Sequence, residues 1–216
     1  MEAEGDDRVA VLDLRDRAVE WAFVAAELER LRLEAGADVV VVAVNGGTEI
    51  AGFEGGSDAR VARFELPVIA ALAGAVRDGT AEFALACDIR VGDESLRLTL
   101  PTSSERLRLL FPGKDGVRPE AEVNAEEALA RGLVSRVAPR GETAFELARK
   151  VASVIAGRGP LATRLAKEAL WRGLAMPMEQ ALRFETDLTL LLQTTKDRAE
   201  GVRAFLEKRP PTFEGE

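Results

Sequence analysis

The chain has 216 residues, 47% of them hydrophobic and 31% charged, which is enough for one domain with a substantial core. A net charge of −8 argues against general binding to nucleic acids or anionic membranes, although a local basic pocket remains compatible with it. The chain has no histidine, which excludes Ser–His–Asp and Cys–His catalysis and most zinc sites. Chemistry must therefore come from carboxylates, hydroxyls, Lys, Arg and backbone dipoles, and we expect no metal.

Targeting signals are missing from the sequence as given. No apolar run approaches the ~18–20 residues of a membrane span, and the acidic start MEAEGDDRV is unlike a signal peptide. We therefore expect a cytoplasmic protein that binds neither membranes nor nucleic acids. The single cysteine, Cys87, lies among apolar residues and is expected to be a small buried side chain.

The N-terminal part predicts strands and one helix. Residues 9–14 predict a strand, and residues 18–33 predict a helix. Four residues at helical spacing predict its buried stripe: Trp21, Val24, Leu28 and Leu31. Residues 39–44 form a continuous apolar run, which indicates a strand buried on both faces. Residues 45–48 predict a turn.

Residues 66–101 carry the strongest pattern in the chain. Residues 68–72 predict a buried strand, and Gly74 and Gly79 bracket a polar loop. A short helix over 80–87 and a strand over 88–91 follow, and a third short strand precedes Pro101.

Two residues of this stretch could carry chemistry. Gly79 lies where the loop enters the helix, so its N–H is available to a ligand oxygen. Glu82 follows three residues later and could act as an acid or a base. Taken alone, the two residues are more typical of a turn glycine and a first-turn acid favoured by the helix dipole.

The same stretch resembles the signature of the crotonase superfamily, the enoyl-CoA hydratase/isomerase family. The resemblance rests on residues 67–71, which read PVIAA, and 82–91, which read EFALACDIRV. It implies an α/β fold with a β-β-α spiral core and a C-terminal helical region. It also implies that Gly79 supplies an oxyanion-hole N–H and that Glu82 is one of two catalytic glutamates.

Residues 49–54 take the place of a second family loop, F-x-A-G-A-D. By resemblance, the N–H of Phe53 is the second oxyanion donor, and Ala51 contacts coenzyme A (CoA). A phenylalanine here could narrow the acyl pocket. A plain surface turn around Gly52 explains the pattern equally well. The loop before it lacks the family's Asn-Arg-Pro pattern, so Arg15 or Arg17 either replaces a basic contact or is a solvated charge.

The chain departs from the family in several places and is identified as a shortened, divergent member. The family's glycine-rich loop keeps one glycine here, and Thr102 stands where the second glutamate is expected. Residues 102–110 predict a capped helical turn, and 111–116 a loop. Glu105 could replace the missing acid, but a solvent-facing carboxylate explains it as well. One carboxylate suits isomerisation or elimination of water better than hydration.

The C-terminal part returns to the family pattern. Residues 124–134 predict an Asn-capped helix that ends at Gly132, followed by a strand over 134–137. Helices are predicted over 142–156, from Pro160, over 178–192 and over 197–208. By resemblance, the last helix lies at a subunit contact, where Phe205 and Lys208 contact the adenine and phosphate end of a neighbouring subunit's CoA. An amphipathic helix with a basic last turn is the alternative.

These observations predict a spiral core over residues 1–140 and a helical trimerisation region over 141–216. The resemblance implies a homotrimer or homohexamer that binds an acyl-CoA thioester and has no resident cofactor. The expected activity is that of an isomerase, a hydratase or a dehydratase, the last two being lyases. In each case the enzyme stabilises an enolate in an oxyanion hole. The alternative is a non-catalytic crotonase-fold subunit or an accessory protein, for example one that assists the processing of polyketide thioesters.

Overall fold

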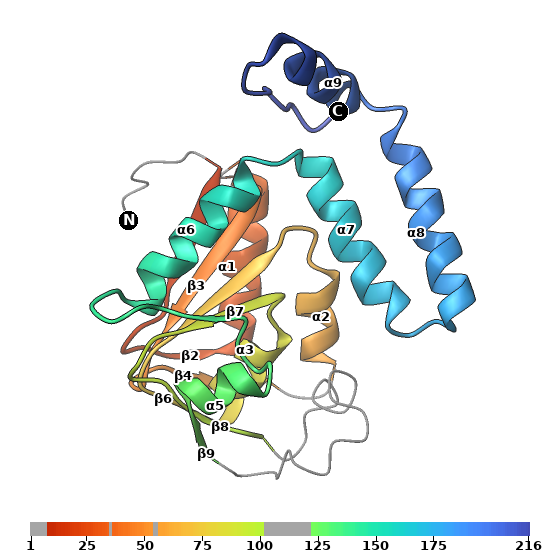
Figure 1. Ribbon diagram of the computed structural model, residues 1–216. Helices are drawn as coiled ribbons and strands as arrows, with labels where there is room; N and C mark the ends of the chain where they lie inside the picture. The colour runs from red at the N-terminus through yellow and green to blue at the C-terminus, as the bar shows by residue number, and fades with distance from the viewer. Residues whose placement is uncertain (1–7, 35, 54–55, 102–121) are drawn as a thin grey trace. The chain divides into compact units, whose positions relative to one another are not determined.

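The computed structural model describes residues 8–34, 36–53, 56–101 and 122–216. The chain divides into two compact units, Met1–Ser153 and Val154–Glu216 (Figure 1). All strands belong to the first unit, and the second is helical. No helix in these described ranges is long and apolar enough to cross a membrane. The trimerisation role expected for residues 141–216 stays a prediction.

Five parallel strands form the main sheet, in the order β1-β3-β5-β7-β10. Their bounds are Val9–Asp13, Val39–Val44, Val68–Leu72, Ile89–Gly92 and Arg136–Val137. Every residue of β3 and β5 is buried. Because a parallel sheet is covered on both faces, its central strands read as continuous apolar runs, and the strands predicted from those runs are confirmed.

Two smaller sheets contain the short strands. Strand β2 (Ala18–Glu20) runs parallel to β4 (Glu49–Ala51). The other small sheet has the order β6-β8-β9, with bounds Ala75–Val76, Arg97–Thr99 and Glu122–Asn124. The prediction that a helix begins at residue 18 is therefore wrong, because pairing with β4 holds residues 18–20 extended. Strand β6 lies inside the stretch predicted as a loop.

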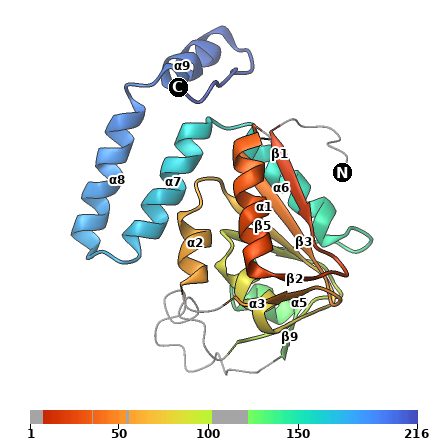
Figure 2. The same cartoon turned by 180° about the vertical axis from the view of Figure 1, so that it is seen from behind.

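The elements follow a repeating order of main-sheet strand, short strand and helix. This order occurs as β1-β2-α1, β3-β4-α2 and β5-β6-α3, and β7-β8 begins it again. The helices span Trp21–Glu34, Ser57–Arg63 and Asp78–Ala86. Each repeat brings the chain back to the next parallel strand of the main sheet, and Figure 2 shows α1 along one face of that sheet. The predicted β-β-α spiral is confirmed.

Helices α1 and α3 contribute much of the core. The predicted α1 stripe is buried, with Trp21 7%, Val24 0% and Leu28 3% exposed. Six of the nine residues of α3 are buried, and the Cys87 side chain that follows is fully enclosed, as predicted. Burying one such large apolar side chain contributes about 1.5–3 kcal/mol. The position of α3 is therefore strongly fixed by packing.

Residues after the second small sheet close the first unit. Asn124 and Glu127 form a reciprocal capping box at the start of α5 (Ala125–Ala130), as the sequence predicts. The buried Arg90 donates from Nε to Leu133 O at 2.6 Å and from Nη1 to Cys87 O at 2.7 Å. It thereby joins the end of α3 to the segment after α5. Helix α6 spans Ala144–Ala156. The helical turn and loop predicted over 102–116 lie outside the described residues.

The second unit contains three helices and a C-terminal tail. Helices α7 (Pro160–Gly173) and α8 (Met178–Leu192) pack together, and α9 spans Lys196–Glu207. The tail folds back onto α9, where the buried Asp197 accepts the N–H groups of Glu214 and Gly215 at 2.8 and 3.0 Å. These charged hydrogen bonds fix the tail to the first turn of α9.

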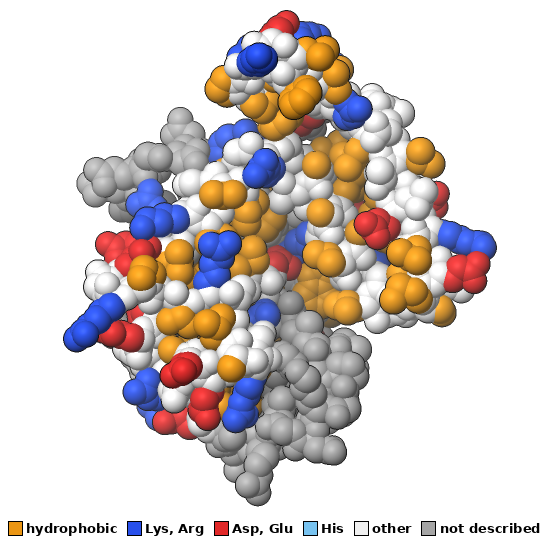
Figure 3. All heavy atoms as spheres, in the orientation of Figure 1, with side chains coloured by type: hydrophobic (Ala, Val, Ile, Leu, Met, Phe, Trp, Pro, Cys, Tyr) orange, Lys and Arg blue, Asp and Glu red, His pale blue; other side chains and the backbone are white. Residues whose placement is uncertain are grey.

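Large apolar side chains remain exposed on these three helices. Figure 3 shows hydrophobic side chains over them. Leu170 is 72% exposed, whereas Leu165 on the same helix is buried. The other large exposed apolar side chains after residue 160 are Leu174, Met178, Leu182, Leu190, Leu191, Val202, Phe205 and Leu206.

The pairing of Glu200 with Arg209 predicts a defined pH dependence of stability. Arg209 donates two hydrogen bonds to this carboxylate, of 2.6 and 2.9 Å, and lowers the pKa of Glu200 from 4.5 to about 2. Because the folded pKa is depressed, the stabilisation is present above about pH 4.5 and is lost as the pH falls towards 2. We expect the difference in unfolding free energy between wild type and Glu200→Gln to shrink across that range in urea titrations.

The matched control for this titration is Glu185→Gln, because the Glu185 carboxylate makes no ion pair within the described residues. Its difference from wild type should stay constant with pH. A Glu200→Gln difference that is equally flat would contradict the assignment of the titration to this ion pair.

Candidate active site

The candidate site begins at the turn that follows β4. Gly52 adopts a positive φ of 71°, a conformation that glycine tolerates best, and so turns the chain into Phe53. The N–H of Phe53 donates to no acceptor within the described residues. An amide left unpaired beside an exposed turn is available to a ligand oxygen.

Helix α3 begins directly against this turn. A β-carbon placed on Gly79 would lie 2.1 Å from Ile50 O and 3.7 Å from the Phe53 β-carbon. Only a glycine allows this approach of two backbones. The Gly79 N–H lies in the first turn of α3, where helical N–H groups have no intrahelical acceptor, and it donates to nothing else in the described part of the chain. The fold thus brings the two predicted donor residues, Phe53 and Gly79, into contact.

Thr80 holds the helix start and the strand in register. Its hydroxyl accepts from the N–H of Ile50 at 3.1 Å and donates to Thr48 O at 3.1 Å. Thr80 is 2% exposed and its bond from Ile50 is buried, so this bond is shielded from water and helps to hold α3 against β4. The role of Thr80 is not predictable from the sequence, because a threonine beside a turn glycine carries no sign of the strand that it will contact.

Three aromatic rings support the turn from inside the core. The Trp21 and Phe53 rings meet edge to face at 4.9 Å, and each lies 6.0 Å from the Phe83 ring. Phe53 is 6% exposed, so its ring is a core side chain that anchors its own amide. The indole Nε1 of Trp21 is buried and has no hydrogen-bond acceptor in the described ranges.

Glu82 lies on α3, half-buried, between the buried residues Ala81 and Phe83. Residues three apart are neighbours on a helix surface, so Glu82 shares a face with the Gly79 position. Asp78, which precedes Gly79, has a positive φ of 50°. A non-glycine residue is uncommon in this conformation and costs about 1–3 kcal/mol. The residue directly before Gly79 thus has a backbone conformation that glycine would adopt more easily.

The remaining predicted site residues fall into three groups. Ala51 ends β4, next to Gly52, and is half-buried. Thr102 and Glu105 lie outside the described residues. Phe205, on α9, is 82% exposed, and Lys208 follows that helix with a φ of 55°. Both belong to the second unit, and their contact with CoA stays a prediction.

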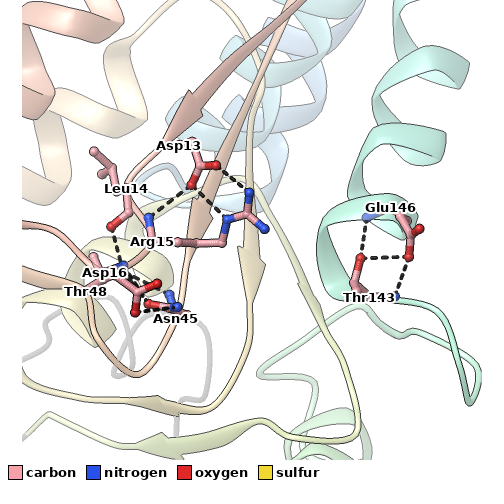
Figure 4. Close-up of polar contacts among 8 residues, drawn as sticks. All are labelled: Asp13, Leu14, Arg15, Asp16, Asn45, Thr48, Thr143 and Glu146. Atoms are coloured by element: carbon pink, nitrogen blue, oxygen red, sulfur yellow. Dashed lines mark hydrogen bonds and ion pairs between the residues drawn. The ribbon is translucent and has the colours of Figure 1, made fainter. Parts of the chain in front are cut away.

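Figure 4 shows how the turn after β1 is held. Arg15 donates to both carboxylate oxygens of Asp13, at 2.9 and 2.5 Å, which lowers the pKa of Asp13 and raises that of Arg15. Asp16 and Asn45 exchange two hydrogen bonds of 3.0 Å. Arg15 is therefore neutralised locally. Arg17 lies 5.9 Å from the Phe23 ring centroid and has no carboxylate partner among the described residues, so it is the better candidate for a basic contact.

Known proteins share both the sequence and the fold. A family model described as enoyl-CoA hydratase/isomerase matches residues 120–216. The chain is 36% identical over 173 residues to 2,3-dehydroadipyl-CoA hydratase of Escherichia coli, an alignment that covers 73% of this chain and 66% of that protein. It is 34% identical over 175 residues to the mitochondrial methylglutaconyl-CoA hydratase of Mus musculus, covering 72% and 55%. The chain thus spans between about half and two thirds of these relatives.

Solved structures extend the likeness to the whole fold. An enoyl-CoA hydratase from Bacillus anthracis superposes with a TM-score of 0.81 at 29% identity, covering 97% of this chain and 96% of that one. An enoyl-CoA hydratase from Polaromonas, only 20% identical, superposes equally well at 0.81 and covers 99% of both chains. The chain belongs to the crotonase superfamily.

The contact between Gly79 and Ile50 predicts a sharp penalty for any side chain at this glycine. We expect Gly79→Ala to lose about 1–3 kcal/mol of unfolding free energy in urea titrations, the usual cost of overpacking a fixed contact. The cause is the 2.1 Å approach of the new methyl group to a backbone oxygen that cannot rotate away.

Gly201→Ala in α9 is the matched control. Its β-carbon would meet only the Phe213 ring, at an ordinary 3.6 Å. An alanine inside a helix is preferred to glycine by roughly 0.5–1 kcal/mol, so this variant should be neutral or slightly stabilised. An equal change in unfolding free energy for the two variants would show that the close approach at Gly79 is not rigid.

Proposed function

We propose that this protein binds an acyl-CoA thioester and moves a proton at the carbon next to its carbonyl through an enolate intermediate. The observation that carries the proposal is the pair of amide groups, Phe53 N–H and Gly79 N–H, held in adjacent backbones without acceptors among the described residues. Two converging N–H donors favour a developing oxyanion over a neutral carbonyl.

In this proposal each residue has one task. The thioester oxygen accepts from the amides of Phe53 and Gly79, and these two hydrogen bonds strengthen as negative charge develops on that oxygen. Glu82 removes the proton from the α-carbon or delivers one to it. Loss of one such donor typically lowers kcat by about 10²–10³, and a positioned acid or base contributes about 10²–10⁴.

The reaction class follows from what happens after enolate formation. Return of the proton to another carbon isomerises a double bond, whereas loss of a β-hydroxyl group gives dehydration and addition of water gives hydration. The relatives compared here are named as hydratases. An isomerase and a lyase of this kind both form the enolate of a CoA thioester. The proposal does not specify the acyl group of the substrate.

CoA binding and oligomer formation complete the proposal. Ala51 would contact the bound CoA, and Phe205 and Lys208 would contact the CoA of a neighbouring subunit. The exposed apolar side chains of α7, α8 and α9 support a homotrimer or a homohexamer, because such a surface is normally buried in an interface.

A non-catalytic crotonase-fold subunit is the second candidate. Two sequence features favour it. Asp78 and Thr80 stand where the family has glycines around Gly79, and Thr102 stands where it has a second glutamate. Such a subunit would keep the fold and could bind acyl-CoA or a protein without turnover.

The role of Glu82 predicts the result of one substitution. Glu82→Gln keeps the size of the side chain but cannot accept the α-proton. We expect exchange of the α-protons of butyryl-CoA in deuterated water, followed by mass spectrometry, to fall by about 10²–10⁴. Exchange that persists at the wild-type rate would exclude Glu82 as the base.

Ligand binding separates the two candidates before any turnover is known. A ligand at 100 times its Kd raises the unfolding free energy by about 2.7 kcal/mol, so a thermal melt with crotonyl-CoA, free CoA and crotonate is informative. The proposed enzyme is stabilised by crotonyl-CoA and not by crotonate. Binding of crotonyl-CoA without α-proton exchange would favour the non-catalytic subunit, and no shift with any CoA species would contradict the proposed function.

A further inference from the structure

Glu20 lies beside the proposed oxyanion turn. In the β2–β4 ladder Glu20 pairs with Ala51, the residue directly before Gly52. A β-carbon placed on Gly52 would meet Glu20 Oε2 at 3.2 Å. Because a carbon–carbon bond adds roughly 1.5 Å, this carboxylate oxygen lies at most about 4.7 Å from the Gly52 α-carbon.

The next residue fixes this arrangement. Trp21 packs its ring against that of Phe53 at 4.9 Å, so residues 20 and 21 contact residues 52 and 53 in order. The Glu20 side chain is exposed, and its carboxylate makes no hydrogen bond or ion pair within the described residues. A carboxyl group beside this turn, with no partner among the described residues, is available to substrate or water.

Two other carboxylates among the described residues are less well placed. Glu49 stands at the opposite end of β4, where it pairs with Ala18. Asp78 is exposed and does not lie within 4 Å of the β-carbon position of Gly52. Of these three acids, only Glu20 has an oxygen against Gly52.

We propose that Glu20 is the second carboxylate of this site and acts as the general base for water in hydration, and as the acid in the reverse elimination. This inference rests on the proposed function, because Glu82 is already assigned to the α-carbon and cannot at the same moment deprotonate water. A base needs to reach the proton it removes directly or through one water, and the approach of Glu20 to the turn satisfies that requirement.

The hydration step balances as follows. The water oxygen forms a bond to the β-carbon of an enoyl thioester while one water proton passes to Glu20. The π electrons move towards the α-carbon and the thioester oxygen, which the amides of Phe53 and Gly79 stabilise. Protonated Glu82 then gives its proton to the α-carbon. The proton on Glu20 returns to Glu82 through solvent, so the product has gained one water and both carboxyl groups are restored.

Two assays on the full chain separate the roles of the carboxylates. The first follows hydration of crotonyl-CoA by loss of its enoyl absorbance. The second follows α-proton exchange of butyryl-CoA in deuterated water. Glu20→Gln should lower the hydration kcat by about 10²–10⁴ and leave α-proton exchange within about twofold of wild type, since exchange needs no water addition. Glu20→Asp should recover part of the hydration rate.

The matched control is Glu49→Gln, which removes an exposed carboxylate from the neighbouring strand and should leave both rates unchanged. Unaltered hydration in Glu20→Gln overturns the inference. An equal loss of both rates in Glu20→Gln also overturns it, because Glu20 would then only position the turn. A wild-type protein that exchanges α-protons but does not hydrate crotonyl-CoA overturns it as well. A wild type without α-proton exchange instead overturns the proposed function itself.

Discussion

The contact between Gly79 and the Ile50 carbonyl is the constraint on which the site depends. At this point the start of a buried helix presses against the backbone of a short strand, with no room for a β-carbon. The Thr80 hydroxyl bridges the same two segments through both of its hydrogen bonds. The bond from Ile50 is buried and the bond to Thr48 is partly buried, so packing and hydrogen bonding together hold the geometry. Without this contact the two unpaired amides would belong to unrelated loops.

The spiral explains why such a contact forms. Each β-β-α repeat places a short strand between a main-sheet strand and a helix, so the short strands and helix starts gather beside the main sheet. The long apolar strands β3 and β5 supply the burial that fixes the repeats. The short strands carry little apolar area and can present backbone groups and polar side chains instead. The fold thus separates the stabilising residues from the residues available for chemistry.

The sequence predicts the parts that depend on local patterns. The main strands, the α1 stripe, the Asn124 cap and the enclosed Cys87 all follow from apolar periodicity or capping chemistry. Short strands are different, because three residues such as 18–20 carry too little pattern to outweigh the helical periodicity that follows them. Phe53 shows the same limit: its side chain suggested a narrowed pocket, yet two aromatic partners distant in the chain draw it into the core.

The departures from the family pattern have a common physical reading. Asp78, directly before Gly79, holds a left-handed backbone at a cost in strain, and Thr80, directly after it, bridges the helix start to Thr48 and Ile50. These two residues flank the Gly79 amide, which has no acceptor in the described part of the chain. In the proposed site one carboxylate, Glu82, lies on α3 and the other, Glu20, lies on β2. The oxyanion dipoles then keep the positions that the family resemblance implies, and the second titratable group comes from another element. That is physically reasonable, since backbone amides depend on the fold whereas a carboxylate needs only a side chain within reach.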